Sequence, residues 1–191
     1  MTEKEIHSLI DLLSAKGVSF DKGLSEVEIA QVKTSFQIEF PEDLKAFLQT
    51  KLPVSVGFVH WRYGINSQKG KEEIIYRLNG PAEGIYFDIR HNGFWMKDWG
   101  EKPDSYQEQK TIAYEHLLKA SWLIPIYSHR YMPGSPSEAG NPVFSVHQTD
   151  IIYYGRTLAD YFSQEFHFQL PDFFSNPSTV KSIPFWSELV S

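Results

Sequence analysis

Cysteine is absent from all 191 residues of the chain. Its absence excludes disulfide bonds, thiolate metal sites and a cysteine nucleophile. A chain without cysteine suits a reducing compartment, so we expect a cytoplasmic protein. Long apolar runs are missing as well, because the longest, residues 52–59, contains Pro53, Ser55 and Gly57. A bilayer span needs roughly 20 apolar residues, and the amino terminus mixes both charge signs, so we expect neither membrane association nor a signal peptide.

Positive charge is scarce relative to negative charge. Lys and Arg total 18 against 24 Asp and Glu, which gives a formal net charge of −6. Phosphate backbones require clustered positive charge, so we do not expect a nucleic-acid partner. Hydrophobic residues make up 41%, enough for a folded core. We expect one domain over residues 1–191, with a core at about 23–167 and a tail, 168–191, packed on its surface.

Catalytic and metal-binding motifs are also absent. The chain has no G-x-S-x-G elbow, no glycine-rich phosphate loop and no H-E-x-x-H pair. A zinc site from His129, His147 and Glu138 is an alternative only if their strands are neighbours, and ordinary polar histidines are the expectation. We therefore expect a protein that is not an enzyme, with no catalytic residue, no metal and no cofactor.

Local patterns predict three short helices in the first fifty residues. Apolar residues at positions 6–13 recur at helical spacing, and Gly17 is placed to end that helix. Ser25 and Glu28 form the S-x-x-E capping box of a second helix. Pro41 suits the first position of a third helix, whose apolar face follows over residues 44–48.

The middle and the end of the chain predict hairpins interrupted by helices. A short helix over residues 71–78 should end at Asn79-Gly80-Pro81. Strands at 85–89 and 94–97 should flank Asn92-Gly93, the strongest short hairpin signal. A helix over about 112–120, a strand at 123–127, a hairpin of 143–146 with 151–154 and a helix opened by Thr157 follow. This order predicts an α+β fold, with N-terminal helices packed on a largely antiparallel or mixed sheet, further helices and an extended C-terminal tail.

The candidate binding residues gather in the predicted loop between the 123–127 and 143–146 strands, because polar and aromatic loop residues on a rigid sheet often form sites. They are Tyr127, His129, Arg130, Tyr131, Glu138, Asn141 and His147. The same residues can instead pin the loop, with an Arg130–Glu138 ion pair that we expect to be at least partly buried and an Asx-type turn at Asn141. Trp95 and Trp99 are a candidate stacking platform, although large rings more often belong to the core.

The stretch from Gly23, GLSEVEIAQVKTSFQIEFPEDLKAFLQ, resembles the opening motif of the SUKH superfamily, also called the Smi/Knr cell-wall-regulator family. In that motif a capped helix ends near an apolar-Pro-x-Asp/Glu step and the next helix carries a Phe-Leu pair, which correspond here to Phe40-Pro41-Glu42-Asp43 and Phe47-Leu48. The segments GIYFDIRHNGFWMKDWG, LIPIYSHRYMP, EAGNPVFSV and DIIYYG resemble one subgroup, so the resemblance covers most of residues 23–167. The chain departs at Thr50-Lys51-Leu52-Pro53, where many relatives have a Gly-Gly or Asn-Gly step.

The resemblance implies an α+β domain that binds other molecules and carries no shared catalytic set. Its bacterial relatives are often immunity proteins that block a toxin, frequently a nuclease, and others act in signalling or cell-wall regulation. We therefore expect a non-enzymatic protein-binding module of the immunity or inhibitor type, with a basic toxin domain as its protein partner. Acidic stretches at 24–45 and 98–108 suit such a partner. The alternative is a small-ligand sensor or regulatory domain with a pocket at the 127–147 loop.

Overall fold

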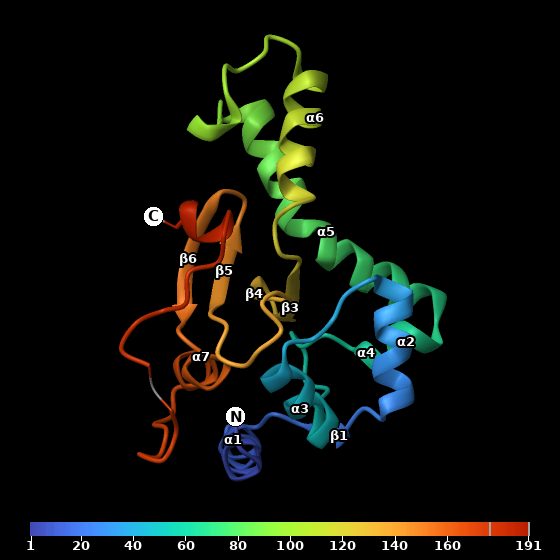
Figure 1. Ribbon diagram of the computed structural model, residues 1–191. Coiled ribbons are helices and arrows are strands. Elements are labelled where there is room, and N and C mark those ends of the chain that lie inside the picture. The colour runs from blue at the N-terminus through green and yellow to red at the C-terminus, as the bar shows by residue number, and fades with distance from the viewer. Residues whose placement is uncertain (176, 191) are drawn as a thin grey trace.

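The computed structural model describes residues 1–175 and 177–190 and shows an α+β fold (Figure 1), which confirms the predicted class. Its helices are α1 (Glu3–Ala15), α2 (Glu26–Phe36), α3 (Glu42–Thr50), α4 (Trp61–Asn66), α5 (Gln68–His91), α6 (Tyr106–Leu117) and α7 (Leu158–Glu165), with 3-10 turns η1 (Lys97–Trp99) and η2 (Trp186–Glu188). Strands β1 (Phe20–Lys22) and β2 (Lys51–Pro53) pair antiparallel. Strands β3 (Leu123–Tyr127), β4 (Arg130–Pro133), β5 (Val143–His147) and β6 (Asp150–Gly155) form an antiparallel sheet in that order.

The second helix begins at the predicted capping box of Ser25 and Glu28. The Ser25 hydroxyl accepts from the Glu28 N–H at 3.2 Å, and the Glu28 carboxylate accepts from the Ser25 N–H at 2.8 Å. Pro41 lies one residue ahead of its predicted position, as the residue that precedes the first turn of α3. The reciprocal hydrogen bonds of Ser25 and Glu28 satisfy N–H groups that the start of α2 would otherwise leave without partners. The start of α2 therefore follows from the local sequence.

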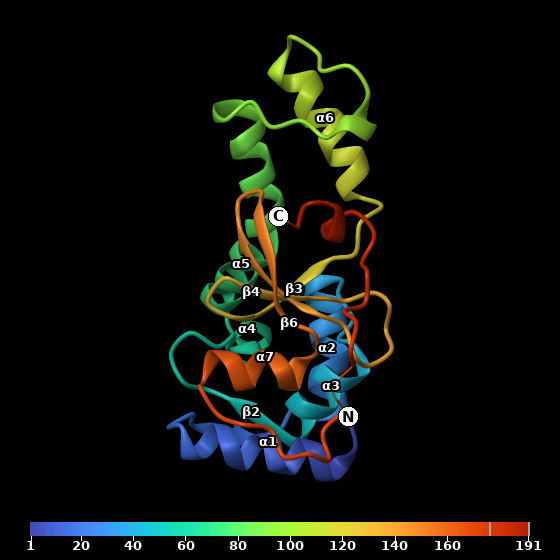
Figure 2. The same ribbon diagram turned by 90° about the vertical axis from the view of Figure 1, so that its left-hand side faces the viewer.

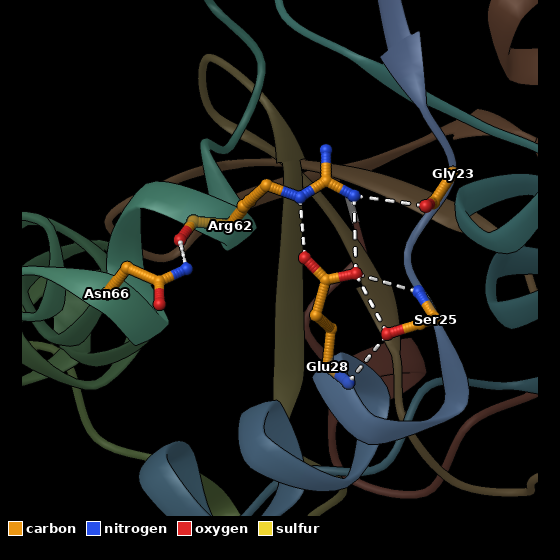
Figure 3. Close-up of polar contacts among 5 residues, drawn as sticks. All are labelled: Gly23, Ser25, Glu28, Arg62 and Asn66. Carbon is orange, nitrogen blue, oxygen red and sulfur yellow. Dashed lines mark hydrogen bonds and ion pairs between the residues drawn. The ribbon is translucent and has the colours of Figure 1, made fainter.

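The capping box of α2 also anchors α4 (Figure 3). The Arg62 guanidinium donates to both Glu28 carboxylate oxygens, at 2.5 and 3.3 Å, and to the Gly23 carbonyl at 3.0 Å. Hydrogen bonds from Arg62 and from the Ser25 N–H lower the pKa of Glu28 from 4.5 to about 2. One carboxylate therefore caps a helix and ties two helices together.

The four-stranded sheet packs against a hydrophobic cluster on each face, which explains why apolar residues stand at successive positions of β3 and at the start of β5. Side chains alternate between two hydrophobic clusters along each strand. The first cluster takes Ile124, Met132 and Val143, and the second takes Leu123, Tyr131 and Phe144. The first cluster also contains the apolar faces of α1, α3 and α7, whereas the second contains the distal part of α5, α6 and the C-terminal tail. The strands that contribute to both clusters therefore lack the strict apolar–polar alternation of a sheet with one solvent face.

The predicted hairpin at Asn92-Gly93 is wrong, and so is the predicted helix end at Asn79-Gly80-Pro81. Residues Gln68–His91 form one helix, α5, with Pro81 inside it. The buried positions Leu78, Pro81, Ile85 and Ile89 recur every three or four residues, which is a helical rather than a β period. Asn92-Gly93 follows the last turn, where a glycine with positive φ commonly ends a helix.

A tertiary hydrogen bond compensates for the proline in α5. Pro81 has no N–H, so the carbonyl four residues earlier, that of Arg77, lacks its intrahelical donor. The buried Tyr131 of β4 supplies one, because its hydroxyl donates to the Arg77 carbonyl at 3.1 Å. The Arg77 guanidinium donates in turn to the carbonyls of Gly57 and Ser128, at 3.2 and 2.9 Å. The helix therefore continues through Pro81 because the sheet completes its hydrogen bonding.

Farther along, α5 packs backbone to backbone against the β5–β6 turn. A Cβ at Gly84 would lie 2.7 Å from the Gln148 Cα, so only glycine permits this approach. One turn later the Asp88 carboxylate accepts from the Thr149 N–H at 2.9 Å and from its hydroxyl at 2.6 Å. These contacts fix the direction in which α5 leaves the sheet.

Beyond the sheet, the distal part of α5 and the returning α6 form a helical arm, which we define as residues 82–118. In both views the arm projects at the end of the molecule opposite α1 (Figures 1 and 2). The C-terminal tail packs at its base, where Ile183, Phe185 and Trp186 are buried in the second cluster. Phe174 is buried too, whereas Phe173 is exposed, and the tail positions 176 and 191 lie outside the described residues.

Tyr131→Phe should lower the unfolding free energy by about 1 kcal/mol, because it leaves the Arg77 carbonyl without a donor. In a Pro81→Ala background residue 81 regains its N–H, so the same change should cost less. Urea denaturation of the parent protein, the two single variants and the double variant measures the coupling free energy between positions 81 and 131. An equal cost of Tyr131→Phe in both backgrounds would show that the hydroxyl does not compensate for the proline.

Glu28→Gln should lower the unfolding free energy at neutral pH by about 1–3 kcal/mol. The folded-state pKa of Glu28 lies below its ordinary value, so its stabilisation is present above about pH 4.5 and is lost as the pH falls toward 2. The variant should therefore show a weaker pH dependence in that window, measured by denaturation at a series of pH values. The exposed Glu42 supplies the control, since Glu42→Gln should have little effect on stability.

Candidate functional site

The sequence-predicted site residues separate into several groups, of which the first surrounds Arg130. Its guanidinium pairs with the Glu165 carboxylate of α7 at 2.9 Å and donates to the Ser145 hydroxyl of β5 at 2.8 Å. It also lies 3.8 Å from the centre of the Tyr154 ring. The side chains of Arg130 and Glu165 are only 11% and 18% exposed. The expected Arg130–Glu138 pair is wrong: the partner is Glu165, and Glu138 is exposed on the β4–β5 loop.

His129 completes this cluster. Burial and the adjacent Arg130 charge lower the pKa of His129, which favours the neutral imidazole. The neutral ring accepts from the Arg130 guanidinium through Nε2, and its Nδ1 contacts the Ser128 hydroxyl at 3.2 Å. The polar groups are therefore bonded mainly to one another, and the cluster joins the sheet to α7.

The remaining loop residues have mainly structural contacts. Tyr127 packs edge-on against Phe58 and Phe166, and Tyr131 points to α5. Asn141 is fully buried, and its amide donates to the carbonyls of Pro133 and Pro136 at 3.0 and 2.7 Å. The predicted loop is shorter than expected, because residues 130–133 form β4 and pair with both β3 and β5.

Near the end of the arm, Trp95 and Trp99 meet edge to face with ring centres 5.0 Å apart. Trp99 is buried and stacks on His116 and Phe185. The Trp95 indole donates to the Gly100 carbonyl at 2.9 Å. Trp99 is thus a core residue of the arm, and Trp95 is the partly exposed edge of the same cluster.

The two acidic stretches differ in their environment. In the 24–45 stretch, Glu26, Glu28 and Glu39 form ion pairs with Lys45, Arg62 and Lys33, and Asp43 is buried. That stretch is not the open acidic face we expected. In the 98–108 stretch, Asp98, Glu101, Asp104 and Glu108 are exposed, and none forms an ion pair within the described part of the chain. This second stretch therefore places four exposed carboxylates on the arm.

Over residues 1–175 and 177–190, no three His, Asp or Glu side chains lie close enough to hold a metal ion. In the same residues, no helix combines the length and the apolarity that a membrane span requires.

Several exposed apolar side chains border a groove that our sequence analysis did not predict. A cavity of about 330 Å³ lies between α5, α6 and residues 120–123. A second cavity, of about 180 Å³, shares Leu78, Asn79 and Trp122 with the first and is also lined by residues 35–37 at the end of α2. We call the two together the α5–α6 groove, which extends along α5 from Ile75 to Tyr86.

The floor of the α5–α6 groove consists of buried side chains, and its rim consists of large exposed apolar ones. Leu78, Tyr86, Leu123 and Trp186 are buried side chains of the floor. The Trp186 indole donates to the Ser121 carbonyl at 2.7 Å, which holds the tail in place beneath it. At the rim, the side chains of Tyr114, Leu118 and Trp122 are 53%, 63% and 53% exposed. Protein-binding surfaces commonly combine such exposed rings with a preformed apolar floor.

A signal for this rim was present in the sequence. Tyr114 and Leu118 are spaced four residues apart, beside the apolar stripe of Ile112, Ala113 and Leu117, and Trp122 follows four residues later, beyond the end of α6. One stripe packs the helix on its own protein, so a second stripe has no internal partner to cover.

Comparisons with protein-family models, with curated proteins and with solved structures find no match to the chain.

Arg130→Ala and Glu165→Ala should each lower the unfolding free energy by about 2–4 kcal/mol, because each leaves a mostly buried charge unpaired. The double variant should lose less than the sum of the two. Glu138→Ala should change stability by less than about 0.5 kcal/mol, since Glu138 is exposed. Denaturation of the set measures these values, and coupling of Arg130 to Glu138 but not to Glu165 would contradict the structure.

Proposed function

We propose that the chain is a non-enzymatic protein-binding module of the inhibitor type, and that it binds its partner through the α5–α6 groove. The observation that carries the proposal is the rim of Tyr114, Leu118 and Trp122 over a preformed apolar floor. Tyr and Trp are enriched among the residues that contribute most to protein association. A monomer gains nothing by leaving three large neighbouring apolar side chains in water.

The distribution of charge supports a cationic partner. The net charge is −6, and Asp98, Glu101, Asp104 and Glu108, on the same arm as the groove, are exposed and form no ion pair within the described residues. Complementary charge speeds the encounter of two proteins and disfavours wrong partners. The SUKH resemblance, in which immunity proteins block toxins, points to the same kind of partner.

The alternative, a small-ligand site at the 127–147 loop, has less support. His129, Arg130, Ser145 and Glu165 form hydrogen bonds and an ion pair with one another, which occupies the groups a polar ligand would use. The two cavities of the groove are lined by none of these residues.

A photoreactive phenylalanine derivative at position 118 should cross-link a protein partner in cells that make this protein. The same group at position 27 should not, although Val27 is equally exposed, at 68%, and lies on α2 outside the groove. The partner is then identified and purified, and its activity is measured with and without this protein.

Binding of the purified partner gives the decisive comparison. Leu118→Asp should raise the dissociation constant at least about tenfold, since a charge enters an apolar contact. Val27→Asp should change it by less than about twofold, and circular dichroism checks that both variants are folded. Equal effects of the two substitutions would reject the groove as the binding surface.

A further inference from the structure

We propose that the partner occupies the α5–α6 groove with an amphipathic helix, whose basic residues lie at the end that faces the acidic 98–108 segment. This inference rests on the proposed function and adds the conformation and the charge of the bound segment.

The shape of the groove favours a helix, because α5 and α6 form the walls of its larger cavity, and the end of α2 lines the smaller one near Ile75. On α6, residues Lys110, Tyr114, Leu117 and Leu118 line the cavity, at the spacing of one helix face. On α5 the lining residues Leu78, Ala82 and Tyr86 recur every four residues. Both walls thus present ridges of side chains, between which the ridge of a third helix can pack. An added helix would complete a three-helix bundle with α5 and α6.

The length of the groove sets the length of the occupant. Ile75 and Tyr86 mark its two ends, and the 11-residue step between them corresponds to about 16 Å along a helix. That distance holds about three turns, enough for apolar anchors at positions i, i+4 and i+7 of a bound helix. The small side chain of Ala82 lies midway between these ends, where a bound helix can approach most closely.

The charge around the groove is uneven along its length. At the distal end Glu83 is exposed, and the Lys110 ammonium lies over the Tyr86 ring, 4.8 Å from its centre. Farther out, residues 97–108 contain four acidic side chains and two lysines. None of these four carboxylates is ion-paired in the residues that the structure describes. A basic end on the bound helix would meet this negative field, so the complementary occupant is a helix with an apolar face and a cationic end.

Two synthetic peptides of about four turns test the inference, one with a leucine face and lysines elsewhere, the other with glutamates in place of the lysines. Calorimetric titration into the full chain should show the lysine peptide binding at least about tenfold more tightly than the glutamate peptide. Leu118→Asp should abolish that difference by weakening the lysine peptide, whereas Val27→Asp should not. Replacing Asp104 and Glu108 together by Asn and Gln should slow association at low salt and have less effect at high salt.

The outcomes separate this inference from the proposed function. Equal binding of both peptides, or lysine-peptide binding that Leu118→Asp does not weaken, would overturn the basic helix as the occupant. Mapping the partner residues that cross-link to position 118 gives the second test. A cross-linked segment that is acidic or extended in the complex would overturn the inference while leaving the proposed function in place. A cross-linked basic helix that loses affinity with Leu118→Asp would support both.

Discussion

The close packing of α5 against the sheet is the constraint on which the rest of the structure depends. At Pro81 the helix lacks a donor, and the Tyr131 hydroxyl of β4 provides it at 3.1 Å. At Gly84 the helix backbone meets the β5–β6 turn. Because α5 continues past these contacts, its first half packs in the first hydrophobic cluster and its second half in the second cluster. If the helix ended at Asn79, α6 and the tail would lack the second half of α5, against which they pack.

Two ion pairs outside the arm are partly buried, whereas the carboxylates of residues 98–108 on the arm are exposed. This difference distinguishes scaffold contacts from the candidate binding surface. In the body, Glu28 with Arg62 and Arg130 with Glu165 are partly buried pairs with further hydrogen bonds. Buried charges are tolerated only when they are matched in this way, so these pairs position helices rather than await a ligand. On the arm, the exposed carboxylates of residues 98–108 and the apolar rim of the groove face solvent.

The α5–α6 groove is preorganised, which matters for the affinity that it can give. Its walls are helices, and its floor includes Trp186, held by the hydrogen bond from its indole to the Ser121 carbonyl. A rigid floor loses little conformational entropy when a partner binds, so more of the contact energy appears as affinity. The tail therefore has a part in the site that its position at the end of the chain does not suggest.

Much of the fold could be predicted from local signals. The Ser25–Glu28 capping box, the Thr157 cap of α7 and the 143–154 hairpin each depend on residues close together in the sequence, and the structure contains all three. The sequence by itself thus determined the α+β class, the starts of α2, α3 and α7 to within a residue, and strands β3, β5 and β6. The tertiary structure alone decided the continuity of α5, the pairing of Arg130 with Glu165, which is 35 residues away, and the assembly of the groove from α5, α6 and Trp186. In each of these cases the deciding contact joins groups from distant segments, and an isolated segment holds only one of the two partners.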